Sequence, residues 1–444
     1  MNLNTDNLAD ISERIVSEAV RAGADDVIVN SISSDTRQIR FSEDRIDIFN
    51  NWKDTSFHLF LAKQKRVVAT TIKGNDDYRE SVRRAISTAS NSEPSGDYSG
   101  IAKVTKARNY FSSERPVSDG ALSNFAHDAI DTATKNGSTA CSGSLYASFY
   151  NRCVVSSAGI SRKESAGSYY LSIRCFRGEQ ASGHSVISSL SSRDFRPRKA
   201  AAKAAMIATS AREPVSCEEG KYDTILDPMV VATLASHMGL MASAYQVISG
   251  FSCLSGKIGK RVASDSVTLE DNAARRLYGF RRFDDEGVDI RQTKIISDGI
   301  LKTYLHNTST SRKFGTRNTA NAGLIEPEAF MLSFSAGDRK LDEMTGELKD
   351  GLYMNNVWYT RYKSYARGDF STIPRDAILR IRKGEIIGSV KGIRITENLI
   401  GLMKRVSAAT REREHLSWWG ESFTPSTVPY ISVKKLNVTK SSDI

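Results

Sequence analysis

Residues 229–245 read Met229-Val230-Val231-Ala232-Thr233-Leu234-Ala235-Ser236-His237-Met238-Gly239-Leu240-Met241-Ala242-Ser243-Ala244-Tyr245, and the rest of the chain is organised around them. Apolar side chains would occupy every side of a helix of this sequence, which is typical of a helix buried in a core. Ser236, His237 and Ser243 interrupt the stretch, and it is shorter than the ~20 apolar residues of a membrane span. The sequence therefore predicts a core helix and no membrane segment.

Two polar segments follow this helix. The first, Leu254 to Ser264, has glycines spaced as in a weak phosphate loop, but no Gly-Lys-Ser/Thr ends it, so we expect a structural turn. The second, Asp284-Asp285-Glu286, offers carboxylates for a divalent cation. The alternative, which we expect, is a solvated acidic turn that pairs with Arg281 and Arg282.

The composition limits the class of protein. The 444 residues include 62 Lys and Arg against 51 Asp and Glu, a formal net charge of +11. No single basic run collects this excess, so it predicts a basic soluble surface rather than a nucleic-acid site. The five cysteines lack a Cys-x-x-Cys pair, which argues against a disulfide framework or a zinc knuckle and suits a reducing cytoplasm. The N-terminus has no signal-peptide pattern, so export is not expected.

The periodicity of apolar residues divides the chain into helices and strands. Helices are predicted at 8–20, 77–90, 117–136, 198–212 and 397–409. Strands are predicted at 27–29, 38–41, 46–49, 56–60, 66–69, 140–155, 168–178, 329–335, 351–365, 378–382, 386–395 and 430–438. Residues 294–301 are predicted to form two strands around a Ser-Asp-Gly turn. This order predicts an α+β protein with an N-terminal mixed α/β domain containing an antiparallel sheet (1–215) and a C-terminal β-rich domain with a buried helix (216–444).

Catalytic motifs are scarce. A zinc peptidase needs two or three converging ligands and a carboxylate to activate water. No two of the six histidines lie within about one helical turn of each other, and no acidic residue occurs between Met229 and Gly250. We therefore expect His237 to be a core or interface residue. The serine-rich segments also lack a Gly-x-Ser-x-Gly elbow.

Several motifs together resemble the TldD/PmbA family. They are Ile225-Leu226-Asp227-Pro228, Leu254-Ser255-Gly256-Lys257-Ile258-Gly259, Thr268-Leu269-Glu270-Asp271 and Phe283-Asp284-Asp285-Glu286-Gly287, with Arg367-Gly368-Asp369 and Lys383-Gly384-Glu385 further on and Arg40-Phe41-Ser42-Glu43-Asp44 near the N-terminus. The resemblance covers nearly the whole chain, and the combination is more specific than any one piece.

The resemblance also implies what the central helix should contain. The TldD branch of the family is a zinc metallopeptidase with His-Glu-x-x-x-His on this helix and a late cysteine ligand. Here the motif positions fall at Ala235, Ser236 and Leu240, with His237 beside them, and Trp419 occupies the region of the cysteine. This degenerate motif resembles the PmbA (TldE) branch and implies neither metal ligands nor catalytic residues in this chain, which would be inactive alone.

By resemblance, the chain is a non-catalytic cytoplasmic subunit that pairs with a TldD-type zinc metallopeptidase, or with itself, to degrade or process unfolded peptides. Zinc is then expected in the partner. Trp358 and Trp418 are candidates for a cleft or an interface, with ordinary core packing as the alternative. Two other functions stay open: a homodimeric regulatory or binding protein associated with nucleic acid, and a metallopeptidase with atypical ligands from His237 and acidic residues elsewhere.

Overall fold

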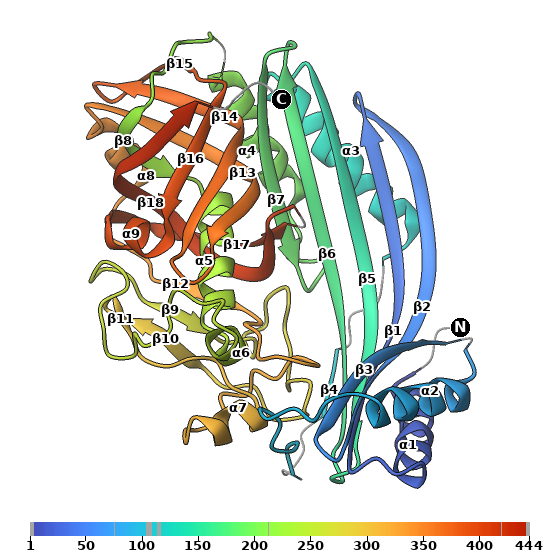
Figure 1. Cartoon of the computed structure of the whole chain (residues 1–444). Helices are drawn as coiled ribbons and strands as arrows, with labels where there is room; N and C mark the ends of the chain where they lie inside the picture. Colours follow the sequence, from blue (N-terminus) through green and yellow to red (C-terminus); the bar gives the residue numbers. More distant parts are fainter. Residues whose placement is uncertain are drawn as a thin grey trace.

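The computed structural model describes residues 4–74, 76–103, 109–112, 117–211, 213–418 and 420–440. Two sheets face each other in it, one formed by strands from the N-terminal half and the other by strands from the C-terminal half (Figure 1). Helices pack on the N-terminal sheet, and the C-terminal sheet holds a buried helix. The predicted α+β class is thus confirmed. The domain boundary at residues 215 and 216 stays a prediction.

The N-terminal sheet has the strand order β3-β2-β1-β5-β6-β4, with β7 on β6. Its long strands pair antiparallel, and only the short β4 runs parallel to its neighbour. The strands are β1 (Asp26–Ser42), β2 (Arg45–Lys63), β3 (Arg66–Lys73), β4 (Tyr110–Phe111), β5 (Ala140–Ser156), β6 (Ser161–Arg177) and β7 (Ala181–Ser189). The helices of this half are α1 (Thr5–Arg21), α2 (Tyr78–Ser90), α3 (Asp119–Lys135) and α4 (Pro197–Ser210).

The predicted turns between 29 and 38 and between 49 and 56 were wrong. Strand β1 pairs with β2 and β5 through both sides of its polar middle, and β2 continues opposite it. Backbone pairing on two sides keeps polar residues in an extended conformation, because every main-chain group already has a partner. Ser31 and Ser33 are accordingly buried within the strand.

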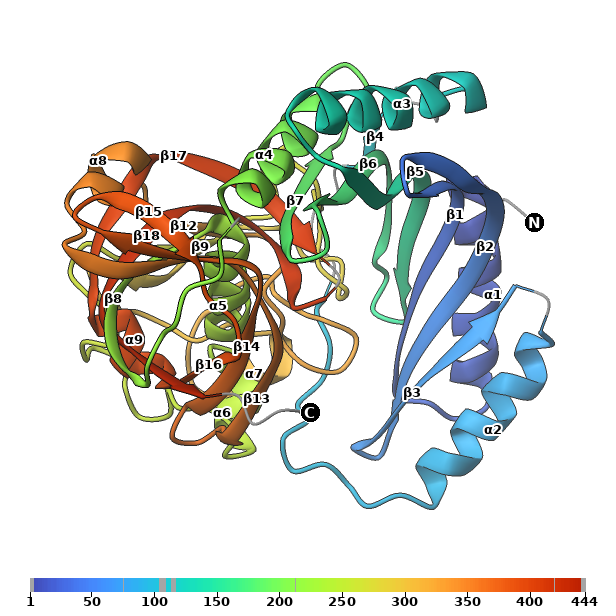
Figure 2. The ribbon, with the colours of Figure 1, turned by 90° about the horizontal axis from the view of Figure 1, so that it is seen from above.

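The two faces of this sheet differ in chemistry. One face is apolar and is covered by α3 and α4, with a core that includes Ile39, Leu145 and Leu171. At the other end of the sheet, α1 and α2 cover the same side (Figure 2). Because side chains alternate along a strand, the residues between these apolar ones point to the opposite face, toward the C-terminal sheet.

The C-terminal sheet has the order β11-β10-β9-β12-β18-β16-β14-β13-β8, and an additional pairing of β18 with β8 closes its larger strands into a ring (Figure 2). Its strands are β8 (Gly220–Leu226), β9 (Leu269–Asp271), β10 (Thr293–Ser297), β11 (Ile300–Leu301), β12 (Leu332–Phe334), β13 (Asp350–Ser364), β14 (Asp369–Arg382), β15 (Glu385–Ser389), β16 (Ile393–Asn398), β17 (Val406–Trp418) and β18 (Ser422–Lys440). Its helices are α5 (Pro228–Met241), α6 (Ala244–Ile248), α7 (Thr308–Lys313), α8 (Leu341–Gly346) and α9 (Leu399–Lys404).

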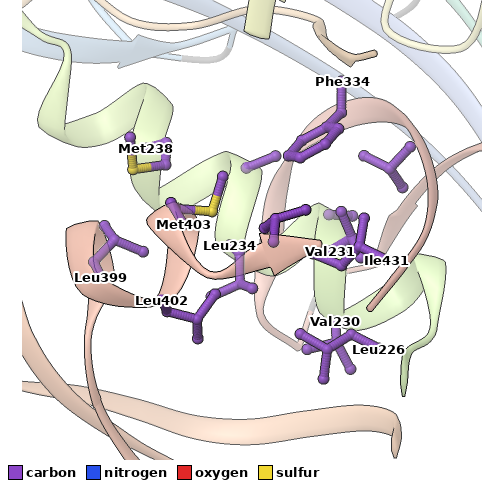
Figure 3. Packing of buried hydrophobic residues seen from close by; sticks show 14 of the residues in the cluster. Leu226, Val230, Val231, Leu234, Met238, Phe334, Leu399, Leu402, Met403 and Ile431 are labelled. Carbon is purple, nitrogen blue, oxygen red and sulfur yellow. The ribbon is translucent and has the colours of Figure 1, made fainter. Parts of the chain in front are cut away.

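Helix α5 is the predicted buried helix. Asp227 caps its start, accepting a hydrogen bond from the Met229 N–H at 2.9 Å, and Pro228 occupies the first turn. Twelve of its 14 residues are buried, packed against β18, β13 and α9 (Figure 3). No helix among the described residues has the length and apolar character of a membrane span.

Two segments of the C-terminal half differ from expectation. The helix predicted at 397–409 ends at Lys404, and β17 begins at Val406 because its residues pair with β18. The run 386–395 forms two strands, β15 and β16, which both pair with β14. Local propensity was overridden in each case by the partner strand.

The acidic turn 284–286 is not the solvated turn that the sequence suggested. Asp284 is fully buried and accepts N–H groups of Glu286, Val288 and Ala322. Asp285 does pair with Arg281, as predicted, but its closer partner is Arg152 of β5 at 2.6 Å. The segment therefore fastens the C-terminal half to the N-terminal sheet.

Candidate functional site

The zinc-motif positions of α5 are occupied by packing side chains. Ala235 is buried in the core, and Ser236 Oγ lies 3.3 Å from Ser422 Oγ at the start of β18. A Cβ on Gly239 would lie 2.9 Å from the Cβ of Ala329, so this side of the helix has no room for a larger residue. Leu240 is exposed. Trp419, the counterpart of the late cysteine, lies outside the described residues.

His237 is isolated from acidic groups. Its ring meets Tyr362 edge-on with centroids 5.2 Å apart, and within the described part of the chain its buried Nε2 has no hydrogen-bond partner. Burial lowers its pKa to about 4, so the imidazole is neutral at pH 7. The described residues also contain no group of three or more His, Cys, Asp or Glu side chains placed to hold a metal ion.

A polar cleft lies where the two sheets meet, with a cavity volume of about 450 Å³. Trp358 of β13 and Trp418 of β17 line it from the C-terminal half, and their ring centroids are 5.6 Å apart. Trp418 is also a core residue, since only 2% of its surface is exposed. From the N-terminal sheet the cleft is lined mainly by Arg40, Ser42, Asp47, Ser142, Ser144, Ser172, Arg174 and His184.

Strand register explains why these side chains meet. Ser144 of β5 lies opposite Arg40 of β1 and opposite Ser172 of β6. Two residues further along, Arg174 lies opposite His184 of β7. Directly opposed residues share a face, so the polar members of four strands form one patch on the side away from α3 and α4.

His184 makes hydrogen bonds through both ring nitrogens. Its Nε2 lies 2.8 Å from Ser172 Oγ and its Nδ1 lies 2.9 Å from Asn356 Nδ2. The same amide nitrogen donates to Asp376 Oδ2 at 2.7 Å, which fixes the orientation of the amide. Because an amide NH₂ only donates, Nδ1 of His184 must accept and Nε2 must carry the proton.

This tautomer decides what the Ser172–His184 pair can do. A general base would have to take the serine proton, whereas here Nε2 donates to the serine oxygen. Burial lowers the pKa of His184 to about 4, which keeps the ring neutral. Ser172 thus keeps its own O–H for a group bound in the cleft. The pair suits ligand binding rather than nucleophilic catalysis.

An ion pair between the partly exposed Arg174 and the buried carboxylate of Asp376 holds this side of the cleft together. Arg174 donates to both carboxylate oxygens of Asp376, at 2.6 and 3.1 Å, and so joins β6 to β14. Burial by itself would raise the pKa of Asp376, but the Arg174 guanidinium, with hydrogen bonds from Arg174 and Asn356, lowers it. Asn355 adds a second connection, since its side chain bonds both the N–H and the C=O of His184.

The residues selected from the sequence and the residues that line this cleft overlap in part. Trp358 and Trp418 were selected, and the cleft brings them together, whereas His237 and the positions 235–240 belong to the helix core and its end. His184, Arg174 and Asp376 were not selected. The alternation of polar residues at 142 and 144 and at 172 and 174 was a usable signal for a polar face, but not for its partner residues in the other half.

Comparison with known proteins agrees with this architecture. A family model described as the PmbA/TldA metallopeptidase C-terminal domain matches residues 219–440, half of the chain. A metalloprotease of Methanocaldococcus jannaschii is 30% identical over 205 residues, which cover 45% of either chain. The metalloprotease PmbA homolog of Haemophilus influenzae is 28% identical over 191 residues, 42% of this chain and 41% of that protein. The chain thus spans about half of the length of the curated relatives it matches, or less.

A solved structure extends the likeness in fold to both halves. TldE from Thermococcus kodakarensis superposes with a TM-score of 0.81 and 19% sequence identity, covering 96% of this chain and 99% of that chain. The similarity between the two structures lies in the arrangement of helices and strands. With the family model spanning the ring of strands and helix α5, the chain belongs to the PmbA/TldD family.

Proposed function

We propose that this chain is a PmbA/TldE-type subunit without catalytic residues of its own, which assembles with a TldD-type zinc metallopeptidase to degrade or process unfolded peptides. The observation that carries the proposal is the content of helix α5. Ala235, Ser236 and Leu240 stand where the family's zinc motif is expected. Ala235 is packed in the core, and Ser236 is within hydrogen-bond distance of Ser422 at the start of β18.

The polar cleft would give this subunit a part in holding peptides. An extended peptide presents carbonyl oxygens, and the cleft offers donors: the Ser172 O–H, and the guanidinium of the exposed Arg40. Trp418 Nε1 is buried without a partner among the described residues, so it is a further unused donor in this region. Recognition of main-chain carbonyls tolerates many side chains, as the processing of varied unfolded peptides requires.

Co-expression with a TldD-type chain tests the proposal. We expect the two chains to co-purify, with zinc in the partner alone, and peptidase activity on an unfolded protein only in the complex. Replacing the motif glutamate of the partner with glutamine should abolish activity. In this chain, His237→Ala should leave zinc content and kcat unchanged. Ser172→Ala should raise KM by about two- to tenfold, the effect of one lost hydrogen bond.

Two results would contradict the proposal. One is chelator-sensitive peptidase activity of the purified chain by itself. The other is stoichiometric zinc in this chain that disappears in His237→Ala, which would favour atypical ligands. A salt-sensitive affinity for DNA in the absence of any effect on the peptidase would instead favour the regulatory alternative.

A further inference from the structure

A second concave surface, separate from the cleft, lies on the C-terminal sheet. It has a volume of about 820 Å³ and is lined by residues of β8, β13, β14, β16 and β18. Its charged lining residues are six cations, Lys221, Arg361, Lys363, Arg367, Arg394 and Arg405, and two anions, Asp369 and Glu397. We call it the basic cup.

The two carboxylates of the cup are already used. Asp369 accepts from Arg367 at 2.8 Å and from Asn398 at 2.9 Å. Glu397 is paired with Arg405 at 2.7 Å and accepts the Asn437 N–H. These pairs neutralise two of the six cations. The other four have no carboxylate partner within the described residues, so the cup carries an excess of positive charge and of donors.

Strand register arranges polar side chains of the cup in a row. One nitrogen of Arg361 donates to the Thr360 carbonyl at 3.0 Å, and the Asn437 amide donates to the Thr396 carbonyl at 2.9 Å. Arg361 of β13 lies opposite Ser371 of β14, which lies opposite Thr396 of β16. At the far side Asn437 of β18 lies opposite Lys221 of β8. Opposed residues share a face, so cations stand at both ends of a row whose middle carries hydroxyl and amide groups.

Arg394 adds a second guanidinium to the middle of the row. It is two residues from Thr396 and therefore on the same face, and its Nη1 donates to Ser371 Oγ at 3.0 Å. Ser371 accepts this bond, and its own O–H donates to no other group among the described residues, so it is available to a ligand. Several donors of different strands thus border one place above Ser371.

We propose that the basic cup binds a phosphate group over Ser371, between Arg361 and Arg394. A phosphate carries nearly two negative charges at pH 7 and three acceptor oxygens, whereas a carboxylate has one charge and two oxygens. A ligand with more acceptor oxygens uses more of the donors that converge there. Planar guanidinium groups also match phosphate geometry better than ammonium groups do. The site requires neither the peptidase partner nor the polar cleft.

Titration of the purified chain tests the site. We expect saturable binding of inorganic phosphate by phosphorus NMR at constant ionic strength, and a phosphomonoester such as phosphoserine shows whether a free or an esterified phosphate fits better. Arg394→Gln should weaken phosphate binding by about ten- to a hundredfold, because a charge-assisted contact is lost. Arg394→Lys keeps the positive charge but lacks the planar guanidinium, so its affinity for phosphate should lie between those of Arg394→Gln and the wild type.

Arg21→Gln is the matched control. Arg21 lies on α1 with 78% of its side chain exposed, and its replacement changes the net charge of the protein by the same amount as Arg394→Gln does. It should bind phosphate as the wild type does. The site is refuted if phosphate binds no better than malonate at equal ionic strength. It is equally refuted if Arg394→Gln and Arg21→Gln lower the affinity alike, which would show a general charge effect.

Discussion

Arg152 and Arg198 make ion pairs of the same length in very different surroundings. Arg152 lies 2.6 Å from Asp285 and 2.7 Å from Glu164, with 6% of its side chain exposed. Arg198 lies 2.6 Å from Asp128 with 70% exposed. Removing the buried arginine leaves carboxylates without compensation, so Arg152→Met should lower the free energy of unfolding by about 3–5 kcal/mol. Chemical denaturation measures this.

Arg198→Met is the comparison for that variant. An exposed pair is screened by water, so this substitution should leave the unfolding midpoint almost unchanged. Equal losses in the two variants would mean that the 284–286 segment is not held by its charges. Burial, rather than the N–O distance, decides the importance of an ion pair here.

His184 should make stability depend on pH. Burial lowers its pKa in the folded protein to about 4, from an ordinary value of 6.5, so the folded state favours the neutral imidazole. The stability from this group is present above pH 6.5 and is lost as the pH falls toward 4. The loss is up to about 3 kcal/mol. In His184→Gln this part of the pH dependence should disappear, as followed by urea unfolding at pH 7 and pH 4.

His127 provides the control for this titration. It lies exposed on α3, so His127→Gln should keep the pH dependence of the wild type. If the stability of His184→Gln depended on pH as that of the wild type does, His184 would not be the neutral ring whose Nε2–H donates to Ser172. The half-buried His237 and the buried His306 remain in both variants and cancel in the comparison.

At the scale of elements, the same substitution should have opposite effects in two helices. Alanine is a better helix former than glycine by about 1 kcal/mol. In α3, a Cβ at Gly120 meets nothing within 4 Å, so Gly120→Ala should raise the melting temperature. In α5, a Cβ at Gly239 would lie 2.9 Å from Ala329 and 3.1 Å from Leu332, and overpacking should cost about 1–3 kcal/mol. Calorimetry of both variants decides whether α5 is as tightly enclosed as described.

Elements were predictable where their signals are local. The helices at 77–90 and 117–136 carry N-terminal caps and a 3.6-residue pattern, and the alanine-rich helix at 198–212 begins at a proline; α2, α3 and α4 agree with them within a few residues. The strands were less predictable, because β1 and β2 extend through polar residues that only their neighbours keep extended. The helix that should have continued to 409 ends early for the same reason.

At the scale of the molecule, the cleft was beyond the reach of a single sequence. Its polar wall comes from strands that pair over long sequence separations, and Arg174 meets Asp376 across 202 residues. Residue types alone did not distinguish these two from other surface charges. The aromatic candidates Trp358 and Trp418 could be selected from the sequence, because large aromatic side chains gather at cores and clefts whatever the topology.

The contact between Arg174 and Asp376 should couple the two halves of the molecule. The Asp376 side chain is 4% exposed, so Arg174→Met leaves a buried carboxylate whose remaining partners among the described residues are Ser182 and Asn356. Asp376→Asn leaves a partly exposed, hydrated guanidinium, and asparagine tolerates the positive φ of 59° at this position. Arg174→Met should therefore lower the free energy of unfolding more than Asp376→Asn does. The double variant should lower it by less than the sum of the two single effects.

A double-mutant cycle with these variants should give a coupling energy of about 1–3 kcal/mol, as for residues in one buried network. Amide hydrogen exchange then tells where the coupling acts. In Arg174→Met, exchange should speed up in β7, whose His184 backbone is held by Asn355, and stay unchanged in α1. A uniform acceleration would indicate global destabilisation, whereas a local one would show that this ion pair closes the side of the cleft where Ser172 and His184 meet a ligand.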